Sequence, residues 1–428
     1  MIRHTPVSDA RKLMRALLVL SVPFFVSACA QIAPQQPVPA EAVAGRPPVI
    51  LVSIDGFRPD YLTRGVTPNL NALAASGARA EAMLPSFPSI TFPNHYTLVT
   101  GLRPDHHGMI GNTMEDARIL PNPRFKLSDR DAVGDRRWWD EAEPVWVTAE
   151  KQGVRTATLF WPGTDADIHG VRPSQWLPFD GKLPADTRVD TLLGWMDKAP
   201  SHYGFYTLYF DDVDHAGHDF GPDTPQAGEA AARVDAAIGR LLAGLKARNI
   251  VANIVVVSDH GMASISKQRQ IRLDQVAPAD SFRTITYGTS GGIQAQPGKE
   301  AVLAAALLKP QQHMQCWRKE DIPARYQFGH NARIPPFFCL ADVGWMIFPD
   351  EERAEKMRDG GAHGYDNTAP EMNALFIASG PAFTHTVLKP FDNVDVYPMV
   401  MSLIGVKPLA NDGSITPLLP ALKTSGTQ

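Results

Sequence analysis

The sequence has few cysteines, little net charge and almost no long hydrophobic runs. Only three of its 428 residues are cysteines, and none lies near the candidate metal ligands described below, which excludes a structural zinc knuckle. The formal net charge is −4, and no basic cluster follows the first residues, so we expect no nucleic-acid-binding surface. Outside the N-terminal region, no apolar segment is long enough to span a membrane.

The N-terminus, residues 1–28, has the features of an export signal. Basic side chains precede an apolar run over residues 16–26, which is too short to cross a membrane. Residues 26–29 resemble the lipobox of bacterial lipoproteins, in which Cys29 receives the lipid; a plain secretory signal is the alternative. The lipoprotein interpretation predicts a periplasmic protein anchored by lipid. The absence of aspartate after Cys29 favours the outer membrane.

The rest of the chain is expected to form a tether and one domain. Residues 29–48 are rich in Ala, Pro and Gln and predict a flexible tether, followed by a single domain over residues 49–420. Cys316 and Cys339 lie in that domain. In an exported chain we expect them to form a disulfide, with two free buried thiols as the alternative.

Short apolar segments that alternate with helical patterns predict an α/β fold. Residues 49–54 and 253–258 are continuous apolar runs, as expected of strands buried on both faces. Residues 226–248 have the apolar stripe of an amphipathic helix. The pattern over residues 283–348 is less regular. We expect a mostly parallel central sheet sandwiched by helices, with an inserted excursion in the second half.

Carboxylates and imidazoles follow several of the predicted strands. Open α/β sheets place their sites at the carboxyl ends of strands. Asp214 and His218 are four residues apart, so one helical turn brings them to the same side. We expect Gly261 to permit a sharp turn that lets Asp259 and His260 reach one metal. The candidate groups are Asp55, Thr91, Asp214, His218, Asp259, His260 and His363.

These seven groups match the needs of two metal ions. Two four-coordinate ions that each keep one position for substrate require about this number of ligands, and a mixture of carboxylate and imidazole suits zinc. Two ions about 4 Å apart can support an in-line displacement at phosphorus. Asp211 and Asp212 are alternative carboxylates. Taken singly, each group also has an ordinary explanation as a cap, turn residue or hydrogen-bonding side chain.

The pattern over residues 86–101 predicts a helix that has a hydroxyl group at its start. Pro93 suits the first helical turn and Gly101 suits its end. Thr91 would then lie at a helix N-terminus, where backbone N–H groups favour an anion, although threonine is also an ordinary N-cap. Asn112, in a loop rich in Gly and Pro, is a candidate amide donor to the same anion or a turn residue.

Six short motifs occur in one order along the chain, at residues 55–58, 91–95, 111–112, 214–218, 259–262 and 361–364. Together they resemble the nucleotide pyrophosphatase/phosphodiesterase family of the alkaline phosphatase superfamily, from about residue 49 to about residue 404. The chain looks like the minimal bacterial catalytic domain, without the additional domains of animal members. The resemblance implies an alkaline phosphatase-like fold and a zinc-dependent phosphodiesterase.

The resemblance also implies roles for the candidate residues. One zinc ion would be held by Asp55, Thr91, Asp259 and His260. The second would be held by Asp214, His218 and His363. Thr91 would attack the phosphodiester and form a phospho-threonine intermediate, which water then hydrolyses. Asn112 and the amide of Thr91 would stabilise the non-bridging oxygen.

The implied substrate is a nucleotide whose phosphodiester or pyrophosphate bond is cleaved to release a nucleoside 5'-monophosphate. Phe92, beside the nucleophile, is a candidate for one wall of the base pocket, and Trp161, in a Trp-Pro-Gly turn, matches an aromatic position of the family. Residues 175–179, with Trp176, are candidates for another wall of the base pocket.

Three alternatives are open. A phospholipid or glycerophosphodiester phosphodiesterase of the same family would need an acidic choline cage, and none is evident. A phosphomonoesterase would need additional positive charge, and the metal motifs contain no obvious Lys or Arg for that role. A non-catalytic binding lipoprotein need not retain two equivalents of zinc, and the intact ligands and Thr91 argue against it.

Overall fold

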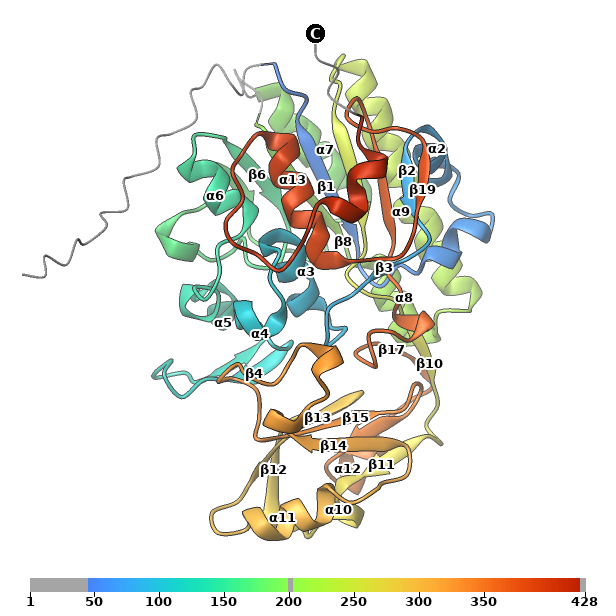
Figure 1. Cartoon of the computed structure of the whole chain (residues 1–428). Coiled ribbons are helices and arrows are strands. Elements are labelled where there is room, and N and C mark those ends of the chain that lie inside the picture. The colour runs from blue at the N-terminus through green and yellow to red at the C-terminus, as the bar shows by residue number, and fades with distance from the viewer. Residues whose placement is uncertain (1–44, 199–202, 424–428) are drawn as a thin grey trace, which may run out of the picture. The chain divides into compact units, whose positions relative to one another are not determined.

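The computed structural model describes residues 45–198 and 203–423 (Figure 1). The predicted signal, Cys29 and most of the predicted tether lie outside these residues, so those expectations stay predictions. Within the described part, no helix combines the length and apolar character needed to cross a membrane.

The central sheet is mostly parallel. Its middle strand, β1 (Val49–Ile54), pairs in parallel with β8 (Phe205–Phe210) and β9 (Asn253–Val257). β6 (Thr156–Leu159) extends the parallel array beyond β8, whereas β18 (Phe376–Ser379) runs antiparallel to β9. The strand order is β19-β2-β18-β9-β1-β8-β6-β7, in which the outer strands are β19 (Thr386–Leu388), β2 (Ala78–Ala80) and β7 (Gln175–Leu177). All residues of β1, β8 and β9 are buried, which explains their continuous apolar sequences.

Helices cover both faces of this sheet, as predicted (Figure 1). Successive residues of a strand point to opposite faces, so Val49 and Ile50 belong to different hydrophobic cores. The core that contains Val49 includes residues of α3 (Thr91–Thr100), α6 (Val145–Lys151) and α13 (Val396–Ile404). The core that contains Ile50 includes residues of α2 (Pro68–Ser76), α7 (Ala185–Lys198) and α9 (Pro225–Ala247).

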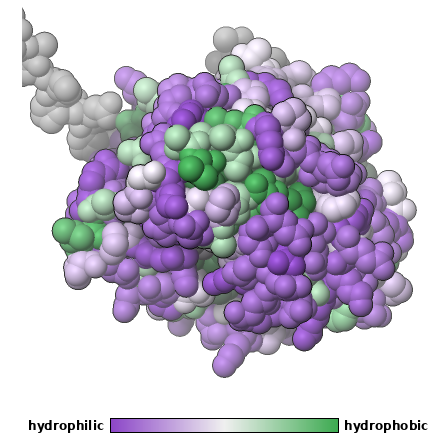
Figure 2. All heavy atoms as spheres, turned by 90° about the horizontal axis from the view of Figure 1, so that it is seen from below, coloured by the Kyte–Doolittle hydropathy of each residue, from purple (hydrophilic) through white to green (hydrophobic). Residues whose placement is uncertain are grey.

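The predicted excursion is an antiparallel sheet with its own hydrophobic core. Its strands, in spatial order, are β12 (Phe282–Thr286), β13 (Ser290–Ala295), β15 (Phe337–Ala341) and β14 (Met314–Arg318). β12 and β13 form a hairpin, and Gly288 in the turn between them adopts a φ of +126°. Seen from below, most of the surface is hydrophilic and apolar side chains form small patches (Figure 2).

The excursion leaves and rejoins the main sheet at one place. β10 (Ala263–Ile265) leads out of the main domain, and β17 (Gly360–Ala362) leads back as its antiparallel partner. β17 also packs on α8 (Asp212–Phe220). A Cβ atom at Gly360 or Gly361 would collide with backbone carbonyl oxygens of α8, so glycine permits this close approach. The excursion thereby helps to position the segment that follows β17.

The predicted disulfide between Cys316 and Cys339 is confirmed. The two residues lie directly opposite each other on β14 and β15, with their sulfur atoms 2.02 Å apart. The bond closes a loop with a sequence separation of 23 residues.

Replacing both cysteines (C316S/C339S) is expected to destabilise the excursion by about 3 kcal/mol, because the cross-link no longer restricts the unfolded loop. Hydrogen exchange of the β14 and β15 amides should then be about 100-fold faster than in the oxidised protein. Wild-type protein treated with a reductant is the matched control. Equal protection in the oxidised and cysteine-free proteins would contradict this expectation.

Candidate metal and phosphate site

Thr91 is the first residue of α3, and its hydroxyl lies beside the candidate metal ligands. Ile90 occupies the N-cap position in extended backbone, so Thr91 is not the helix cap considered as the alternative. Its Oγ1 atom lies 3.2 Å from Nε2 of His260. The hydroxyl therefore lies at a helix N-terminus, where backbone N–H groups favour a bound anion.

Asp55, Asp259 and His260 form the first candidate metal group. Asp55 follows β1 and the other two residues follow β9, which is the neighbouring strand. Nε2 of His260 lies 2.9 Å from Asp259 Oδ2 and 3.5 Å from Asp55 Oδ1. Gly261 is not among the glycines with a positive φ. A Cβ atom there would collide with the Glu371 carbonyl oxygen, so glycine permits the close approach of these two backbone segments.

Asp214, His218 and His363 converge beside the first group. Asp214 and His218 are one turn apart on α8, as their spacing predicts. Nε2 of His218 lies 3.5 Å from Asp214 Oδ2 and 3.2 Å from Nε2 of His363. Nε2 of His363 lies 3.6 Å from Asp214 Oδ1. The structure thus brings all seven candidate ligands into one cluster, and their assignment as ligands stays a prediction.

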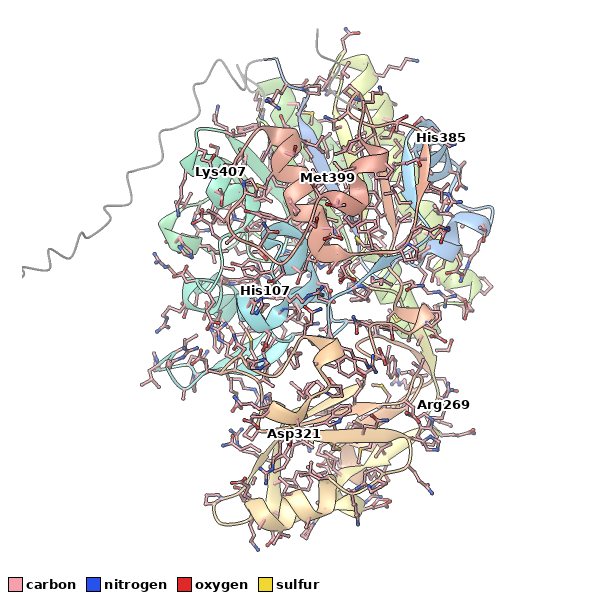
Figure 3. All side chains as sticks on the ribbon, in the orientation of Figure 1. His107, Arg269, Asp321, His385, Met399 and Lys407 are labelled. Carbon is pink, nitrogen blue, oxygen red and sulfur yellow. A yellow bond between two sulfur atoms is a disulfide. The ribbon has the colours of Figure 1, made fainter. Side chains whose placement is uncertain are left out.

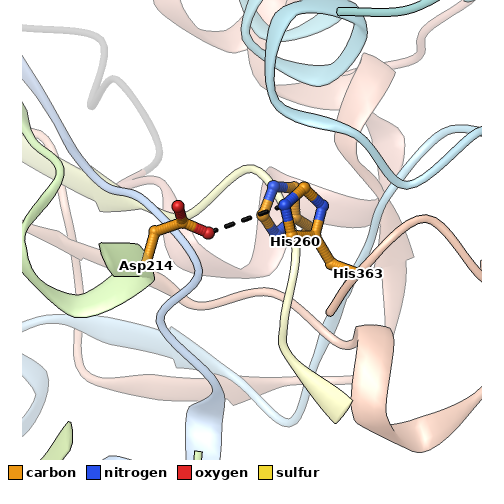
Figure 4. Close-up of side chains that lie close together, drawn as sticks. All are labelled: Asp214, His260 and His363. Atoms are coloured by element: carbon orange, nitrogen blue, oxygen red, sulfur yellow. Dashed lines mark ion pairs between the residues drawn. The ribbon is translucent and has the colours of Figure 1, made fainter. Parts of the chain in front are cut away.

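The two groups adjoin through stacked imidazoles. The ring centroids of His260 and His363 are 3.5 Å apart, and their planes are inclined by 12°. Asp214 faces this pair of rings (Figure 4). His260 therefore belongs to two compact sets of possible ligands, one with Asp55 and Asp259 and the other with Asp214 and His363. Such a shared position is compatible with two adjacent cation sites.

Three buried carboxylates have acceptor oxygen atoms that no hydrogen bond from the described residues satisfies and that a metal ion can bind. Oδ1 of Asp55, Oδ1 of Asp214 and Oδ2 of Asp259 have no hydrogen-bond partner among the described residues. A buried acceptor without a partner costs about 1–3 kcal/mol. Carboxylate oxygens and imidazole nitrogens together are typical zinc ligands, so the residues present fit a divalent cation.

Backbone carbonyl groups orient the three histidines of the cluster. Nδ1 of His218, His260 and His363 lies 2.8, 2.8 and 3.0 Å, respectively, from a carbonyl oxygen. In the neutral ring Nδ1 therefore carries the proton, and the lone pair of Nε2 faces the cluster. Metal-binding histidines are commonly oriented by a hydrogen bond of this kind.

Without a cation, the cluster disfavours the ionised forms of Asp55 and Asp214. Burial, together with the charges of Asp259 and Asp214, raises the pKa of Asp55 well above its ordinary value. Burial also raises the pKa of Asp214. Burial acts in the same direction on Asp259, but His260 and His95 outweigh it and hold the pKa of that carboxyl well below its usual range. A divalent cation would offset the repulsion among these charges.

Two other carboxylates and one other histidine do not belong to the cluster. Asp211, an alternative carboxylate, forms a buried ion pair of 2.9 Å with Arg188 and is already neutralised. Asp212 belongs to neither compact ligand set. His107 lies on α4 (Pro104–His107), where its Nε2 is 3.0 Å from the Thr97 hydroxyl (Figure 3). Burial lowers the pKa of His107 to about 3, so it is a neutral hydrogen-bonding residue.

Sequence reasoning missed two residues behind the ligands. The Tyr209 hydroxyl donates a 2.6 Å hydrogen bond to Oδ2 of Asp55. Nδ1 of His95 lies 2.9 Å from the Thr91 carbonyl oxygen and 3.4 Å from Oδ2 of Asp259. The four-residue spacing from Thr91 to His95 could have indicated a shared helix face. Tyr209 lies within an apolar strand, and its sequence context carries no comparable signal.

The predicted anion-binding amide is held close to the hydroxyl. The backbone N–H of Phe92 donates a 2.9 Å hydrogen bond to Oδ1 of Asn112. This bond uses the carbonyl end of the Asn112 amide and leaves its NH2 end available as a donor to a substrate. Asn112 and the N-terminus of α3 therefore converge on one position.

The candidate aromatic residues lie in different surroundings. Phe92 is partly buried beside Phe125 and Trp139. Trp161 is only 2% exposed and donates its indole N–H to the carbonyl oxygen of His95, so it supports α3 from within the core. Trp176 lies on the edge strand β7 (Gln175–Leu177) beneath the Arg172 guanidinium.

Phe179, in the segment for which Trp176 was named, lies nearer the ligands. Its ring contacts that of Tyr209 with centroids 6.1 Å apart, and Tyr209 in turn binds Asp55. Phe179 is half-buried and therefore retains exposed ring surface. The structure consequently favours Phe179 over Trp176 as an aromatic residue beside the site.

The fold and the site together define a class of protein. A mostly parallel α/β sheet with carboxylates and histidines at its strand ends, and a hydroxyl at an adjoining helix N-terminus, describes a hydrolase of the alkaline phosphatase-like fold. The family model for type I phosphodiesterase/nucleotide pyrophosphatase matches residues 49–366. The chain belongs to this family.

Similar proteins support the assignment over most of the chain. An uncharacterized pyrophosphatase/phosphodiesterase of Schizosaccharomyces pombe is 38% identical over 388 residues, which cover 87% of this chain and 80% of that protein. Bovine ectonucleotide pyrophosphatase/phosphodiesterase family member 3 is 37% identical; the match covers 86% of this chain but only 43% of the relative. The structure of inactive murine ectonucleotide pyrophosphatase/phosphodiesterase 5 with AMP has a TM-score of 0.83 and 33% identity, and covers 88% of this chain and 100% of that one.

Removing metal ions is expected to lower the stability of the protein, because the buried carboxylates then repel one another. Free zinc at 1,000 times its dissociation constant should restore about 4 kcal/mol. Thermal unfolding and zinc content measure this effect without reference to activity. Asp259→Asn should lose bound zinc and most of the stabilisation, whereas the matched control Asp212→Asn should retain both. Unfolding that is insensitive to zinc in the wild type would contradict a metal site here.

Proposed function

We propose that the chain is a nucleotide pyrophosphatase/phosphodiesterase with two zinc ions, which releases nucleoside 5'-monophosphates through a phospho-threonine intermediate. The observation that carries this proposal is the Thr91 hydroxyl, 3.2 Å from Nε2 of His260 and next to the unpartnered carboxylates. The proposed ligands of the first ion are Asp55, Thr91, Asp259 and His260, and those of the second are Asp214, His218 and His363. Bound zinc would supply positive charge that lowers the pKa of the hydroxyl and neutralises the phosphate.

The side chains of the protein account for the remaining chemistry. Thr91 Oγ1 attacks phosphorus, a bond forms between them, and the bond from phosphorus to the leaving-group oxygen breaks. The NH2 group of Asn112 and the N-terminus of α3 bind the non-bridging oxygens. Water then cleaves the Thr91–phosphorus bond, which releases the nucleoside monophosphate and restores the hydroxyl.

The nucleoside that remains on the threonine is proposed to bind beside the aromatic residues. Phe92 directly follows the nucleophile, and Phe179 retains exposed ring surface beside Tyr209. Aromatic faces of this kind can stack on a nucleobase. The AMP bound in the similar murine structure supports a nucleotide as the substrate class.

Export and lipid attachment are part of the proposal. The signal-like N-terminus and the lipobox ending in Cys29 are consistent with a periplasmic, lipid-anchored protein. The disulfide between Cys316 and Cys339 supports an oxidising compartment.

Thr91→Ala is expected to lower kcat by at least about 1,000-fold, because it removes the nucleophile. The measurement compares turnover of a nitrophenyl ester of thymidine monophosphate with turnover of nitrophenyl phosphate. The wild type should prefer the nucleotide diester. Thr91→Ser keeps a hydroxyl and should retain far more activity, while an unchanged far-UV circular dichroism spectrum confirms that each variant is folded.

Two outcomes would contradict different parts of the proposal. Unchanged activity in Thr91→Ala would remove the nucleophile assignment. A preference for nitrophenyl phosphate would instead leave the nucleophile in place and overturn the substrate class.

A further inference from the structure

His95 lies directly behind Thr91, and the reaction proposed above gives it no role. It follows Thr91 by about one turn of α3, and its side chain is fully buried. A buried imidazole is costly unless its two nitrogen atoms have hydrogen-bond partners. The partners of His95 therefore indicate what this side chain contributes.

Both ring nitrogen atoms of His95 have partners. Nδ1 lies 2.9 Å from the carbonyl oxygen of Thr91, and Nε2 lies 2.8 Å from the Ser53 hydroxyl. A carbonyl oxygen only accepts hydrogen bonds, so Nδ1 carries the proton and Nε2 accepts a hydrogen bond from Ser53. Since both nitrogen atoms are used in this way, His95 is not available to a metal ion, and it belongs to neither compact ligand set.

Ser53 connects His95 to the strand that leads to a candidate ligand. Alternate residues of a strand share one face of the sheet, which places Ser53 with Val49 and Leu51 on the side of the core that contains α3. Ser53 is the one polar residue in the sequence of β1, and it is fully buried. Asp55 follows it by two residues. The hydrogen bond to His95 thus joins α3 to the end of β1.

Three further contacts hold the imidazole of His95 in place. Nδ1 also lies 3.4 Å from Oδ2 of Asp259, which follows the neighbouring strand β9. The rings of Trp161 and Tyr209 pack edge-on against the imidazole, with ring centroids 5.1 and 5.2 Å away. A side chain among such closely packed neighbours has little rotational freedom. His95 therefore links the first turn of α3 to the ends of two strands.

The orientation of Thr91 depends on the backbone of this first turn. The candidate ligands Asp55 and Asp259 follow buried strands, whereas Thr91 begins a helix, where the first backbone N–H groups have no partner within the helix. A displacement of about 1 Å between reacting atoms can lower a rate about 100-fold. A contact that fixes the Thr91 carbonyl group relative to the strand ends therefore bears directly on the attack.

We propose that His95 is a positioning residue that holds Thr91 in the orientation needed for attack on phosphorus. Its Nδ1–H binds the Thr91 carbonyl oxygen, and its Nε2 anchors the ring to Ser53. This inference rests on the proposed function, in which Thr91 is the nucleophile. Because His95 touches neither the substrate nor a metal ion, its loss should slow the attack and leave nucleotide and zinc binding nearly unchanged.

Substitutions at two positions separate the hydrogen bonds of His95. His95→Leu removes both bonds. His95→Asn keeps an amide N–H near the position of Nδ1, whereas His95→Gln places its amide near Nε2 and loses the contact with the Thr91 carbonyl. Ser53→Ala removes only the partner of Nε2. The matched control is His107→Leu, since His107 is also buried and its Nε2 contacts the Thr97 hydroxyl on the same helix.

The measured quantity is the rate of the first turnover. Purified protein with its zinc is mixed with the nitrophenyl ester of thymidine monophosphate, and release of nitrophenol within one turnover reports the attack of Thr91. The dissociation constant of thymidine monophosphate and the zinc content report whether the site is intact. Far-UV circular dichroism checks that each variant is folded.

His95→Leu and His95→Gln should each lower the first-turnover rate about 100-fold, while the dissociation constant and the zinc content change less than about twofold. His95→Asn should be about tenfold faster than His95→Gln, because it restores the donor to the Thr91 carbonyl. Ser53→Ala should lower the rate about fivefold, as expected for the loss of one hydrogen bond. His107→Leu should leave the rate unchanged.

Several results would overturn the positioning role. One is a wild-type rate in His95→Leu, and another is an equal rate in His95→Asn and His95→Gln, a comparison that stands even where His95→Leu does not fold. A loss of zinc or of affinity for thymidine monophosphate that matches the loss of rate would show that His95 only stabilises the site. Unchanged activity in Thr91→Ala would instead overturn the proposed nucleophile, so the two failures are distinguishable.

Discussion

Mutual repulsion among buried carboxylates is the constraint on which this structure depends. Asp55, Asp214 and Asp259 each have a buried oxygen without a hydrogen-bond partner among the described residues. A fold that gathers such groups loses free energy unless a cation offsets their charge. The orientation of the three histidines, with Nε2 directed into the cluster, completes a donor set for that cation. The surrounding architecture can be understood as a scaffold for this concentration of charge.

The central sheet brings residues that are distant in sequence to one edge. Asp55 and Asp259 are far apart in sequence, yet they follow the adjacent parallel strands β1 and β9 and so reach the same edge. Asp214 lies in the first turn of α8, shortly after β8, which is the other neighbour of β1. Because these strands are buried on both faces, their positions are rigid. Thr91, the proposed nucleophile, is the first residue of α3, and the N-terminus of this helix favours anions.

The excursion adjoins the cluster of candidate ligands. It departs through β10 just after His260 and returns through β17 just before His363, so its return segment leads directly into a candidate ligand. Its disulfide and separate hydrophobic core make it a rigid support.

The amino-acid sequence by itself predicted the α/β class, the inserted excursion, the disulfide and the seven candidate ligands, since apolar periodicity and residues at strand ends are local signals. It did not identify Tyr209 behind Asp55, and it favoured Trp161 and Trp176 where the structure has a buried support and an edge-strand residue. The sequence also did not reveal the groove that Asn112, His218 and His363 line, because its lining residues come from segments that only folding brings together. Local sequence patterns determined the helices and strands and the types of side chain at the strand ends. Tertiary packing decided which side chains face one another, because burial and contact depend on residues distant in sequence.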